Sequence, residues 1–374
     1  MDGIPREYPL RVLHVGPLPP PWTGIGVFLL NFMASLPIRG QSNWVINTSQ
    51  ETLPGAPNRP KWPTPARMIH HVRLAAQIVR KIKRYKIQVV HLNGSSHDLS
   101  FWGNWVSVLA AKLTGASVVW HLHEDLDVAL LPGKTWLRRT AFALSARTAD
   151  MIVVLTEKDR QLLLDLIPAA KLAVLSPTCD PSLFELGLPK EEGQIHVLYV
   201  GWLTQAKGIY DLLQVAIDMP EVVFDVLGTG MSMAETNAIH LFVDQHGLRS
   251  RVNLHGVLTG KAKQMMFARA HVFMVPTHWD AFPVAVLEAM AAGLPILGTR
   301  VGGLPIMLEN GRGAFLVDVG STSQMSGYLT RLSKDADLRY EMGKVNRERC
   351  RALYHPDKVG QHALDLYLRL VRRH

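Results

Sequence analysis

The feature that most constrains this chain is a regular alternation of short apolar runs and longer helix-like segments along its whole length. Runs such as 151–155 are apolar without a polar alternation, which is typical of parallel strands that helices cover on both faces. The alternation therefore predicts parallel sheets with crossover helices, an α/β architecture. The runs expected to form strands are Leu10–Gly16, Trp44–Asn47, Gln88–Leu92, Ser117–His123, Met151–Leu155, Leu172–Leu175, Ile195–Gly201, Val222–Gly228, Val252–Gly256, His271–Pro276, Pro295–Thr299 and Ala314–Val317.

These runs fall into two sets of six, separated by the segment 186–194, which combines Gly, Pro and charge without periodicity. We therefore expect two doubly wound, Rossmann-like domains, residues 1–188 and 189–355, facing each other across a cleft. Residues 356–374 predict a final helix that is free to pack back on the first domain, with Leu364, Tyr367, Leu368 and Val371 on one face. Ligands of such sheets bind beyond the carboxyl ends of the strands.

Composition excludes several classes of protein. With 48% hydrophobic and 19% charged residues the chain is globular rather than disordered. The two cysteines, Cys179 and Cys350, have no metal-ligand spacing, and we interpret both as buried thiols in a reducing compartment. No apolar segment reaches the roughly 20 residues of a membrane span, and the first residues do not resemble a signal peptide. We expect a cytoplasmic protein.

A basic stretch stands out in the first half. Between Glu51 and Asp98 there are nine Lys or Arg and no acid. The segment Arg67–Ile87 predicts an amphipathic helix with an apolar stripe formed by Met68, Val72, Ala75, Val79 and Ile82. An anionic membrane surface and a merely solvated basic face both fit this pattern. Nucleic acid fits less well, because no aromatic residues are interleaved with the cations.

Polar groups follow several predicted strands. Glycines at Gly24 and Gly26 precede a helix-like segment, where free N–H groups favour an anion or simply form a turn. His121 and His123 end the fourth strand and point to the same side. A metal site would need further ligands that no spacing supplies, so a buried pair or a polar group aimed into the cleft remain as alternatives. Lys207 follows the seventh strand and could meet a phosphate, or it could be an ordinary surface lysine.

The segment 275–305 is the most informative. A buried strand ends at Pro276, and Pro283 is well placed in the first turn of a helix, whose free N–H groups would face a ligand. Asp280 lies just before this helix and Glu288 within it, so both acids could contact one extended polar ligand. Helix capping by Asp280 and a solvated Glu288 are the alternatives.

Asp280 and Glu288, separated by seven residues and followed by AMAAGLP and VGG, resemble the E-x7-E motif of glycosyltransferase family 4 (GT4), whose members are retaining enzymes with the GT-B fold. Other segments resemble the family in the same order. They are the first-loop Gly24, the strand-end His123, Thr156, the phosphate segment with Gly201, Lys207 and Gly208, the turn with Gly228 and Gly230, and the nucleobase loop with Gly256 and Val257.

The resemblance implies a retaining hexosyltransferase that moves a sugar from a UDP-sugar or GDP-mannose to a hydroxyl of a glycan or lipid-linked acceptor in cell-envelope or exopolysaccharide synthesis, without metal or cofactor. The first domain would bind the acceptor and the second the donor. The implied catalytic residues are His123, Lys207, Asp280 and Glu288. The implied donor-binding residues are Gly24, Gly26, Gly201, Trp202, Gly256, Val257, Thr277, Phe282, Pro283, Val284 and Leu287.

Four positions depart from the family pattern. Asp280 stands where the family has Glu, and Trp202 stands where it has an Arg that binds phosphate, a role that Arg300 or the Trp202 indole could take over. The segment 176–184 lacks the glycine of the interdomain signature, and Ile306 replaces a Glu. Two other functions therefore stay open: a sugar-nucleotide 2-epimerase on the same fold, and a catalytically weak glycosyltransferase-like subunit.

Overall fold

The computed structural model describes residues 9–20, 22–49, 65–94, 98–124, 126, 136–184 and 193–372. The chain forms two compact units: unit 1 comprises Met1–Pro177 with Pro356–His374, and unit 2 comprises Thr178–His355. The division lies before the expected boundary at 188, because residues 178–184 pack within unit 2. There the Cys179 amide donates to the Tyr354 carbonyl at 3.1 Å, and the Phe184 ring lies 5.2 Å from that of Phe267. Most of the expected linker 186–194 lies outside the described residues.

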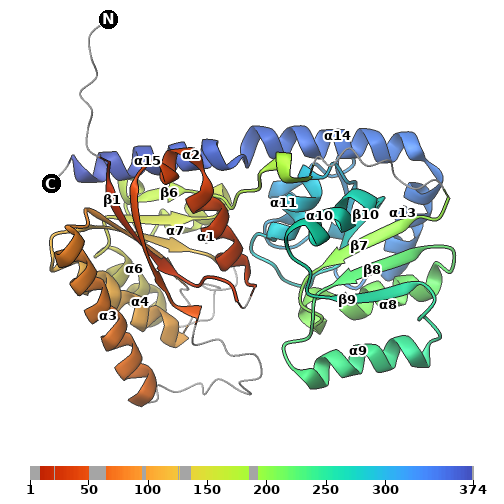
Figure 1. Cartoon of the computed structure of the whole chain (residues 1–374), viewed down its shortest axis with the longest axis horizontal. Helices are drawn as coiled ribbons and strands as arrows, with labels where there is room; N and C mark the ends of the chain where they lie inside the picture. Colours follow the sequence, from red (N-terminus) through yellow and green to blue (C-terminus); the bar gives the residue numbers. More distant parts are fainter. Residues whose placement is uncertain are drawn as a thin grey trace, which may run out of the picture. The chain divides into compact units, whose positions relative to one another are not determined.

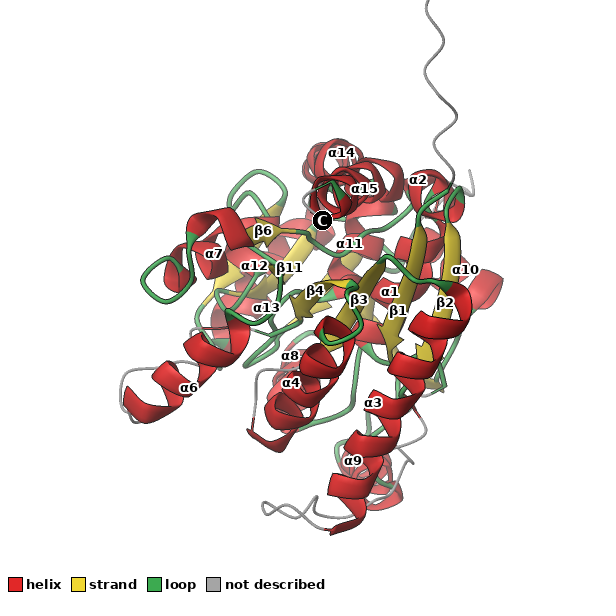
Figure 2. Ribbon diagram, turned by 90° about the vertical axis from the view of Figure 1, so that its left-hand side faces the viewer, coloured by secondary structure: helices red, strands yellow, loops and turns green. Residues whose placement is uncertain are grey.

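Unit 1 is built on a six-stranded parallel sheet. Its strands are, in spatial order, β2 (Ser42–Asn47), β1 (Arg11–Gly16), β3 (Val89–Gly94), β4 (Ser117–Leu122), β5 (Met151–Val154) and β6 (Leu172–Val174). On one face lie α3 (Pro65–Tyr85), α4 (Asp98–Lys112) and α6 (Trp136–Ala146), and on the other lie α1 (Gly24–Ala34), α2 (Leu36–Arg39) and α15 (Pro356–Val371), as Figure 2 shows. The helix α7 (Glu157–Leu163) follows β5. Helices on both faces explain why these strands are largely apolar.

Unit 2 repeats the plan with the strand order β12 (Ala314–Val317), β11 (Ile296–Thr299), β10 (Val272–Val275), β7 (His196–Val200), β8 (Val223–Leu227) and β9 (Val252–Gly256) (Figure 1). One face carries α8 (Ile209–Asp218), α9 (Met233–Gln245) and α13 (Thr322–Lys334). On the opposite face Phe267 of α10 (Gly260–Arg269) stacks on Phe273 of β10. The helix α11 (Val284–Ala291) packs along α14 (Ala336–Leu353), where the Cys350 thiol lies 3.7 Å from the Leu287 carbonyl. The short helix α12 (Leu304–Met307) and the 3₁₀ turns η2 (Ala169–Lys171), η3 (Pro181–Phe184) and η4 (Gln205–Lys207) complete the described elements.

The sequence-based fold class is confirmed. All twelve expected strands form, and every pairing in both sheets is parallel. Both cysteines are buried, as expected. Within the described residues no helix combines the length and apolar character that crossing a membrane requires.

The helix α15 belongs to unit 1, where Asp357 accepts a hydrogen bond from the Leu36 amide at 2.8 Å. Tyr367 is buried, as expected, but Leu364, Leu368 and Val371 are only partly buried. The buried face is instead completed by Val359, Ala363, Leu366 and Leu370. The contact stripe is therefore rotated toward these smaller and aliphatic residues, which pack on α1 and the sheet.

The apolar stripe expected on α3 is partly wrong. Ala75 and Ile82 are buried with Leu74 and Ile78, which the expected stripe left out. Met68 and Val72, which were placed in the stripe, are 60% and 63% exposed, and Ile69 beside them is 50% exposed. The sheet accommodates only the second half of this helix, so its first described turns present apolar side chains to solvent.

Candidate functional site

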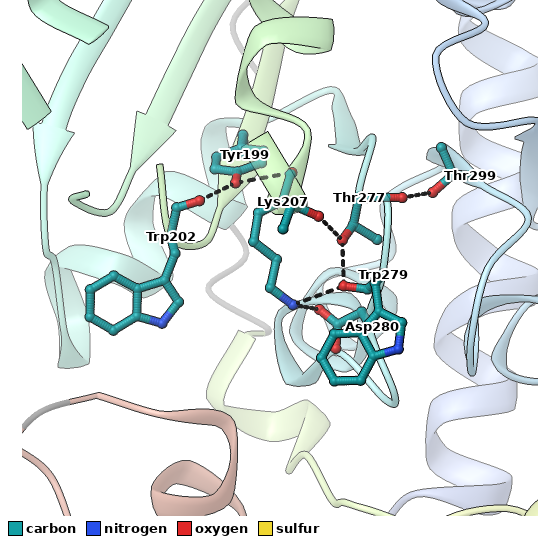
Figure 3. A network of polar contacts seen from close by, with 8 residues as sticks. Tyr199, Trp202, Lys207, Thr277, Trp279, Asp280 and Thr299 are labelled. Carbon is teal, nitrogen blue, oxygen red and sulfur yellow. Dashed lines mark hydrogen bonds and ion pairs between the residues drawn. The ribbon is translucent and has the colours of Figure 1, made fainter. Parts of the chain in front are cut away.

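The loop after β10 is the centre of the candidate site (Figure 3). Thr277 is buried and its hydroxyl donates to the carbonyls of Trp279, at 2.9 Å, and Ala206, at 3.2 Å. The Thr299 hydroxyl of β11 in turn donates to the Thr277 carbonyl. These bonds tie the ends of three neighbouring strands together and hold residues 277–280 in one conformation.

Asp280 and Lys207 form an ion pair within this network. The Lys207 amine lies 2.6 Å from the Asp280 carboxylate and donates to the Trp279 carbonyl at 3.2 Å. Its Nζ also lies 5.7 Å from the centre of the Trp279 ring, an aromatic face that favours a cation. Both side chains are about one-fifth exposed, at 24% and 21%. An anionic ligand could therefore reach the lysine by displacing one carboxylate.

Two glycines allow this close packing. Gly208 follows Lys207 with φ of +73°, and a β-carbon there would collide with the Pro276 carbonyl. Gly302 has φ of +51° and a β-carbon would collide with the Asp280 carbonyl. Side chains at either position would push away the strand end or the loop that carries the acid. Gly302, which follows AMAAGLP, thus serves to place Asp280.

The helix α11 begins directly after this loop. The sequence predicted Pro283 in the first turn of this helix, but the structure places it one residue earlier, at the N-cap. Three predicted donor-binding residues are buried and fix the position of the helix start by packing: Phe282, Val284 and Leu287. The free N–H groups of the first turn carry partial positive charge, which favours an anion at this end.

Glu288 lies inside α11 and is 7% exposed. Lys263 of α10 places its amine 2.6 Å from Oε1 and 2.6 Å from Oε2 of this carboxylate. The alternative of a solvated Glu288 is therefore wrong. The motif thus contains two acids, each paired with a lysine from another element of unit 2. Lys263 could not be predicted from the sequence, because no local pattern links it to an acid 25 residues away.

The carboxyl ends of β7, β8 and β9 bring three predicted glycines together. The Gly201 amide donates to the Leu227 carbonyl at 3.0 Å, and the Gly228 amide donates to the Gly256 carbonyl at 2.8 Å. Val257, next to Gly256, is 53% exposed. These loops lie at the sheet edge where ligands bind in doubly wound folds.

Trp202 follows Gly201, and its carbonyl accepts a hydrogen bond from the Tyr199 hydroxyl at 2.8 Å. The indoles of Trp202 and Trp279 lie on opposite sides of the Lys207 side chain in Figure 3. Arg300 donates to the Leu316 carbonyl at 2.8 Å and lies 3.7 Å from Asp318. Arg300 is therefore already bound to the backbone and close to Asp318, so it is less suited to replace the phosphate-binding arginine of the family.

The remaining predicted residues belong to unit 1. Gly24 and Gly26 begin α1, where the Thr23 hydroxyl caps the helix by accepting from the Gly26 amide at 3.1 Å. His123 follows β4, is partly exposed, and lies 4.8 Å from the Phe28 ring of α1. Its Nε2 is 3.0 Å from the Asn93 side-chain oxygen, and burial lowers its pKa to about 3. His123 is therefore neutral at ordinary pH.

A row of buried histidines lies behind His123. His14, His91 and His121 come from β1, β3 and β4, and each is fully buried. His91 is 3.2 Å from His121 and 2.5 Å from the Tyr367 hydroxyl of α15. Burial lowers the pKa of all three, to about 4 for His14. His121 is thus the core member of the His121 and His123 pair. The burial of these histidines could have been predicted from the sequence, since each histidine lies within an otherwise largely apolar strand.

No group of three or more His, Cys, Asp or Glu side chains is arranged to hold a metal ion among the residues described. Of the two acids that follow His123, Glu124 is buried and Asp125 lies outside the described residues.

Two family models match this chain. The family described as Glycosyl transferases group 1 matches residues 186–349, and Glycosyltransferase Family 4 matches residues 22–183. Among curated relatives, D-inositol 3-phosphate glycosyltransferase of Corynebacterium jeikeium is 28% identical over 52% of this chain and 52% of its own. Sulfoquinovosyl transferase of Arabidopsis thaliana is 25% identical over 74% of this chain and 55% of its own. The alignments thus span about half the length of these relatives.

Solved structures share the fold over nearly the whole chain. Sucrose-phosphate synthase of Thermosynechococcus elongatus superposes with a TM-score of 0.77 at 17% identity, covering 97% of this chain and 100% of the other. HepE of Anabaena in complex with UDP gives a TM-score of 0.74 at 16% identity, covering 96% and 99%. These superpositions support the GT-B fold, and the two family matches together span most of the sequence. The chain belongs to the group 1 glycosyltransferases of family 4.

Proposed function

We propose that this protein is a retaining glycosyltransferase that moves a sugar from a nucleotide-diphosphate donor to a hydroxyl of a glycan or lipid-linked acceptor. The observation that carries the proposal is the arrangement of Lys207, Asp280 and Glu288 around the start of α11. A cation, free helix N–H groups and two hydrogen-bonding carboxylates are together suited to a diphosphate linked to a sugar and a ribose. The donor would be a UDP-sugar or GDP-mannose.

In this mechanism the bond between the sugar C1 and the diphosphate oxygen breaks, and the acceptor oxygen bonds to C1 on the same face. The acceptor proton passes to an oxygen of the departing diphosphate. Lys207 and the free N–H groups of the first turn of α11 stabilise the negative charge that develops on this leaving group. Asp280 accepts hydrogen bonds from sugar hydroxyls, and Glu288 accepts them from the ribose. His123, which is neutral, is available to a hydroxyl of sugar or acceptor.

These roles need no metal, because the charge on the leaving group is met by a lysine and by backbone dipoles. Trp202 stands where the family has an arginine, so Lys207 carries more of this charge than the corresponding lysine of a relative would. The lysine is already held in place by Asp280 and Trp279. We expect a donor phosphate to take over one of these contacts.

Two variants separate donor binding from transfer. Lys207→Ala should weaken UDP or GDP binding and lower turnover by about a hundredfold or more, the effect of losing one donor to a developing oxyanion. Asp280→Ala should keep nucleotide binding, since it removes a negative charge, yet lose transfer. The control is Lys344→Ala, an exposed lysine of α14. Calorimetry with nucleotides and a release assay with UDP-glucose, UDP-GlcNAc and GDP-mannose give both quantities.

The same experiment tests the rival functions. Formation of a C2 epimer from UDP-GlcNAc without acceptor would favour the epimerase. If the wild type binds nucleotides but turns over no donor with any acceptor offered, a glycosyltransferase-like subunit without activity is the better description.

We further propose that the protein works on the cytoplasmic face of a membrane, which α3 contacts. Met68, Ile69 and Val72 are exposed on this helix, and Trp102 of the neighbouring α4 is 49% exposed. The exposed cations Arg73, Arg80, Lys83, Arg84 and Lys86 follow along the same helix and just after it. Apolar side chains at one end with cations nearby suit an anionic lipid surface, where each cation contributes about 1 kcal/mol.

Vesicle sedimentation tests this contact. The wild type should bind vesicles that contain phosphatidylglycerol better than vesicles of phosphatidylcholine, and salt should weaken the binding. Neutralising Arg80, Lys83 and Arg84 should reduce it. Neutralising Arg249, Lys261 and Arg312, three exposed cations of unit 2, is the matched control. Equal binding by the two triple variants would exclude α3 as the contact.

A further inference from the structure

Lys263 has a geometry that the proposed mechanism leaves unused. It lies in the first half of α10, and its amine is 2.6 Å from both carboxylate oxygens of Glu288. The side chains are 20% and 9% exposed, so this pair is largely shielded from water. The contact is therefore not one of the solvated surface pairs that contribute little.

Two uncharged groups lie beside this pair. The Cys179 thiol interacts electrostatically with both Glu288 and Lys263, and its hydrogen bond with the Cys350 thiol together with burial raises its pKa, so it carries no charge. The Phe267 ring lies 5.9 Å from the Lys263 amine. A carboxylate in such a place requires a positive partner, because an unpaired buried charge is strongly unfavourable.

The two lysine–acid pairs of the site differ in a way that suggests different roles. Lys207 divides its donors between Asp280 and a backbone carbonyl, so it can turn toward a phosphate. Lys263 donates a hydrogen bond to Oε1 of Glu288 and lies 2.6 Å from Oε2, so the ion pair fixes the orientation of the carboxylate. The other oxygen, Oε2, is buried and accepts no hydrogen bond in the structure, so its acceptor positions remain for other donors. Glu288 lies five residues after the N-cap, about 7.5 Å along the helix axis from where an anion would sit.

We propose that Lys263 is a positioning residue for the donor: it holds Glu288 so that the free lone pairs of the carboxylate meet the two ribose hydroxyls, and it offsets the negative charge that would repel the diphosphate. The inference rests on the proposed function, since it assumes a nucleotide at this site. It adds that ribose recognition depends on an ion pair between α10 and α11 and not on Glu288 alone.

The test compares UDP with 2′-deoxy-UDP by calorimetry. In the wild type Glu288 should favour UDP, because the deoxy compound lacks one hydroxyl. Lys263→Met should weaken UDP binding about tenfold and remove most of this preference, as expected for losing a hydrogen bond to a charged group. Lys263→Arg, which keeps the charge, should retain most of both. Lys261→Met changes an exposed lysine of the same helix and should behave as wild type.

Kinetics give a second reading. Lys263→Met should raise the KM for the donor with a smaller effect on kcat, whereas Lys207→Ala should lower kcat. If Lys263→Met does not fold, the double variant Lys263→Met with Glu288→Gln removes both charges and is compared with Glu288→Gln alone. The two should bind UDP equally, because the lysine then has no acid to hold.

The results distinguish a failure of the proposed function from a failure of the proposed role of Lys263. If the wild type binds neither UDP nor GDP, both the proposed function and the role of Lys263 are wrong. If it binds UDP but Lys263→Met binds as tightly, with the same preference over 2′-deoxy-UDP, only the role of Lys263 is wrong. Weaker binding by the double variant than by Glu288→Gln would also overturn it, since it would show an effect that does not pass through Glu288.

Discussion

The buried histidine His14 should make unit 1 sensitive to acid. Its Nε2 lies 2.9 Å from the Asn43 side-chain oxygen, and the Asn43 amide donates to the carbonyls of Ile38 and Gln41. Because that amide is committed as a donor, the Asn43 oxygen must be the acceptor, and His14 carries its proton on Nε2. Its other nitrogen, Nδ1, is buried without a hydrogen-bond partner in the structure. Protonation would place an unsatisfied N–H and a charge in the core.

The size of the effect follows from the pKa. Burial lowers the pKa of His14 from 6.5 to about 4, with the bond to Asn43 offsetting part of the shift. Since the folded-state pKa is the lower one, the stabilisation is fully present above pH 6.5 and is lost as the pH falls toward 4. Linkage gives a loss of about 2 kcal/mol at pH 5 and about 3.4 kcal/mol below both pKa values. The pKa values of His91 and His121 are shifted in the same direction and add to this.

The assay is urea unfolding followed by circular dichroism at pH 7.5 and pH 5. His14→Gln keeps an N–H donor for Asn43 but cannot be protonated, so its free energy of unfolding should fall by about 2 kcal/mol less than that of the wild type over this interval. His240→Gln, at an exposed position of α9, should fall as much as the wild type. An equal decrease in His14→Gln and wild type would refute the assignment of a neutral, Nε2-protonated His14.

Two further predictions concern unit 2. Gly208→Ala combines a positive φ with a collision against the Pro276 carbonyl, so it should destabilise the protein by more than about 2 kcal/mol and abolish UDP binding. Gly247→Ala has a positive φ but open space around it, so it should destabilise the protein by only about 1 kcal/mol. Thermal unfolding with and without UDP measures both effects. Asn346 is fully buried, and its amide donates at 2.7 Å to the carbonyls of Leu294 and Gly313. Asn346→Leu leaves both carbonyls without this donor, so it should lower the free energy of unfolding, measured in urea, by about 3 kcal/mol. A loss under about 1 kcal/mol would mean that water replaces the amide.

Much of this molecule is determined by local sequence. The twelve strands were predictable because each is a short apolar run bounded by turn residues, and helices on both faces impose that pattern whatever the details of packing. The segment around Asp280 was predictable for a similar reason. A strand, a turn, Pro283 and a helix lie in sequence order, so the acid had to be near the helix start.

The tertiary structure alone decided which groups meet. Lys207 pairs with an acid 73 residues away, and Tyr367 reaches His91 across 276 residues. The exposed start of α3 was likewise beyond prediction, because periodicity gives the apolar face of a helix but not the length over which a sheet covers it. Sequence patterns record each residue's own environment, solvent or core, strand or helix. Partners distant in the chain are set by how the sheets and helices pack, and the ion pairs that define the candidate site belong to that second kind of information.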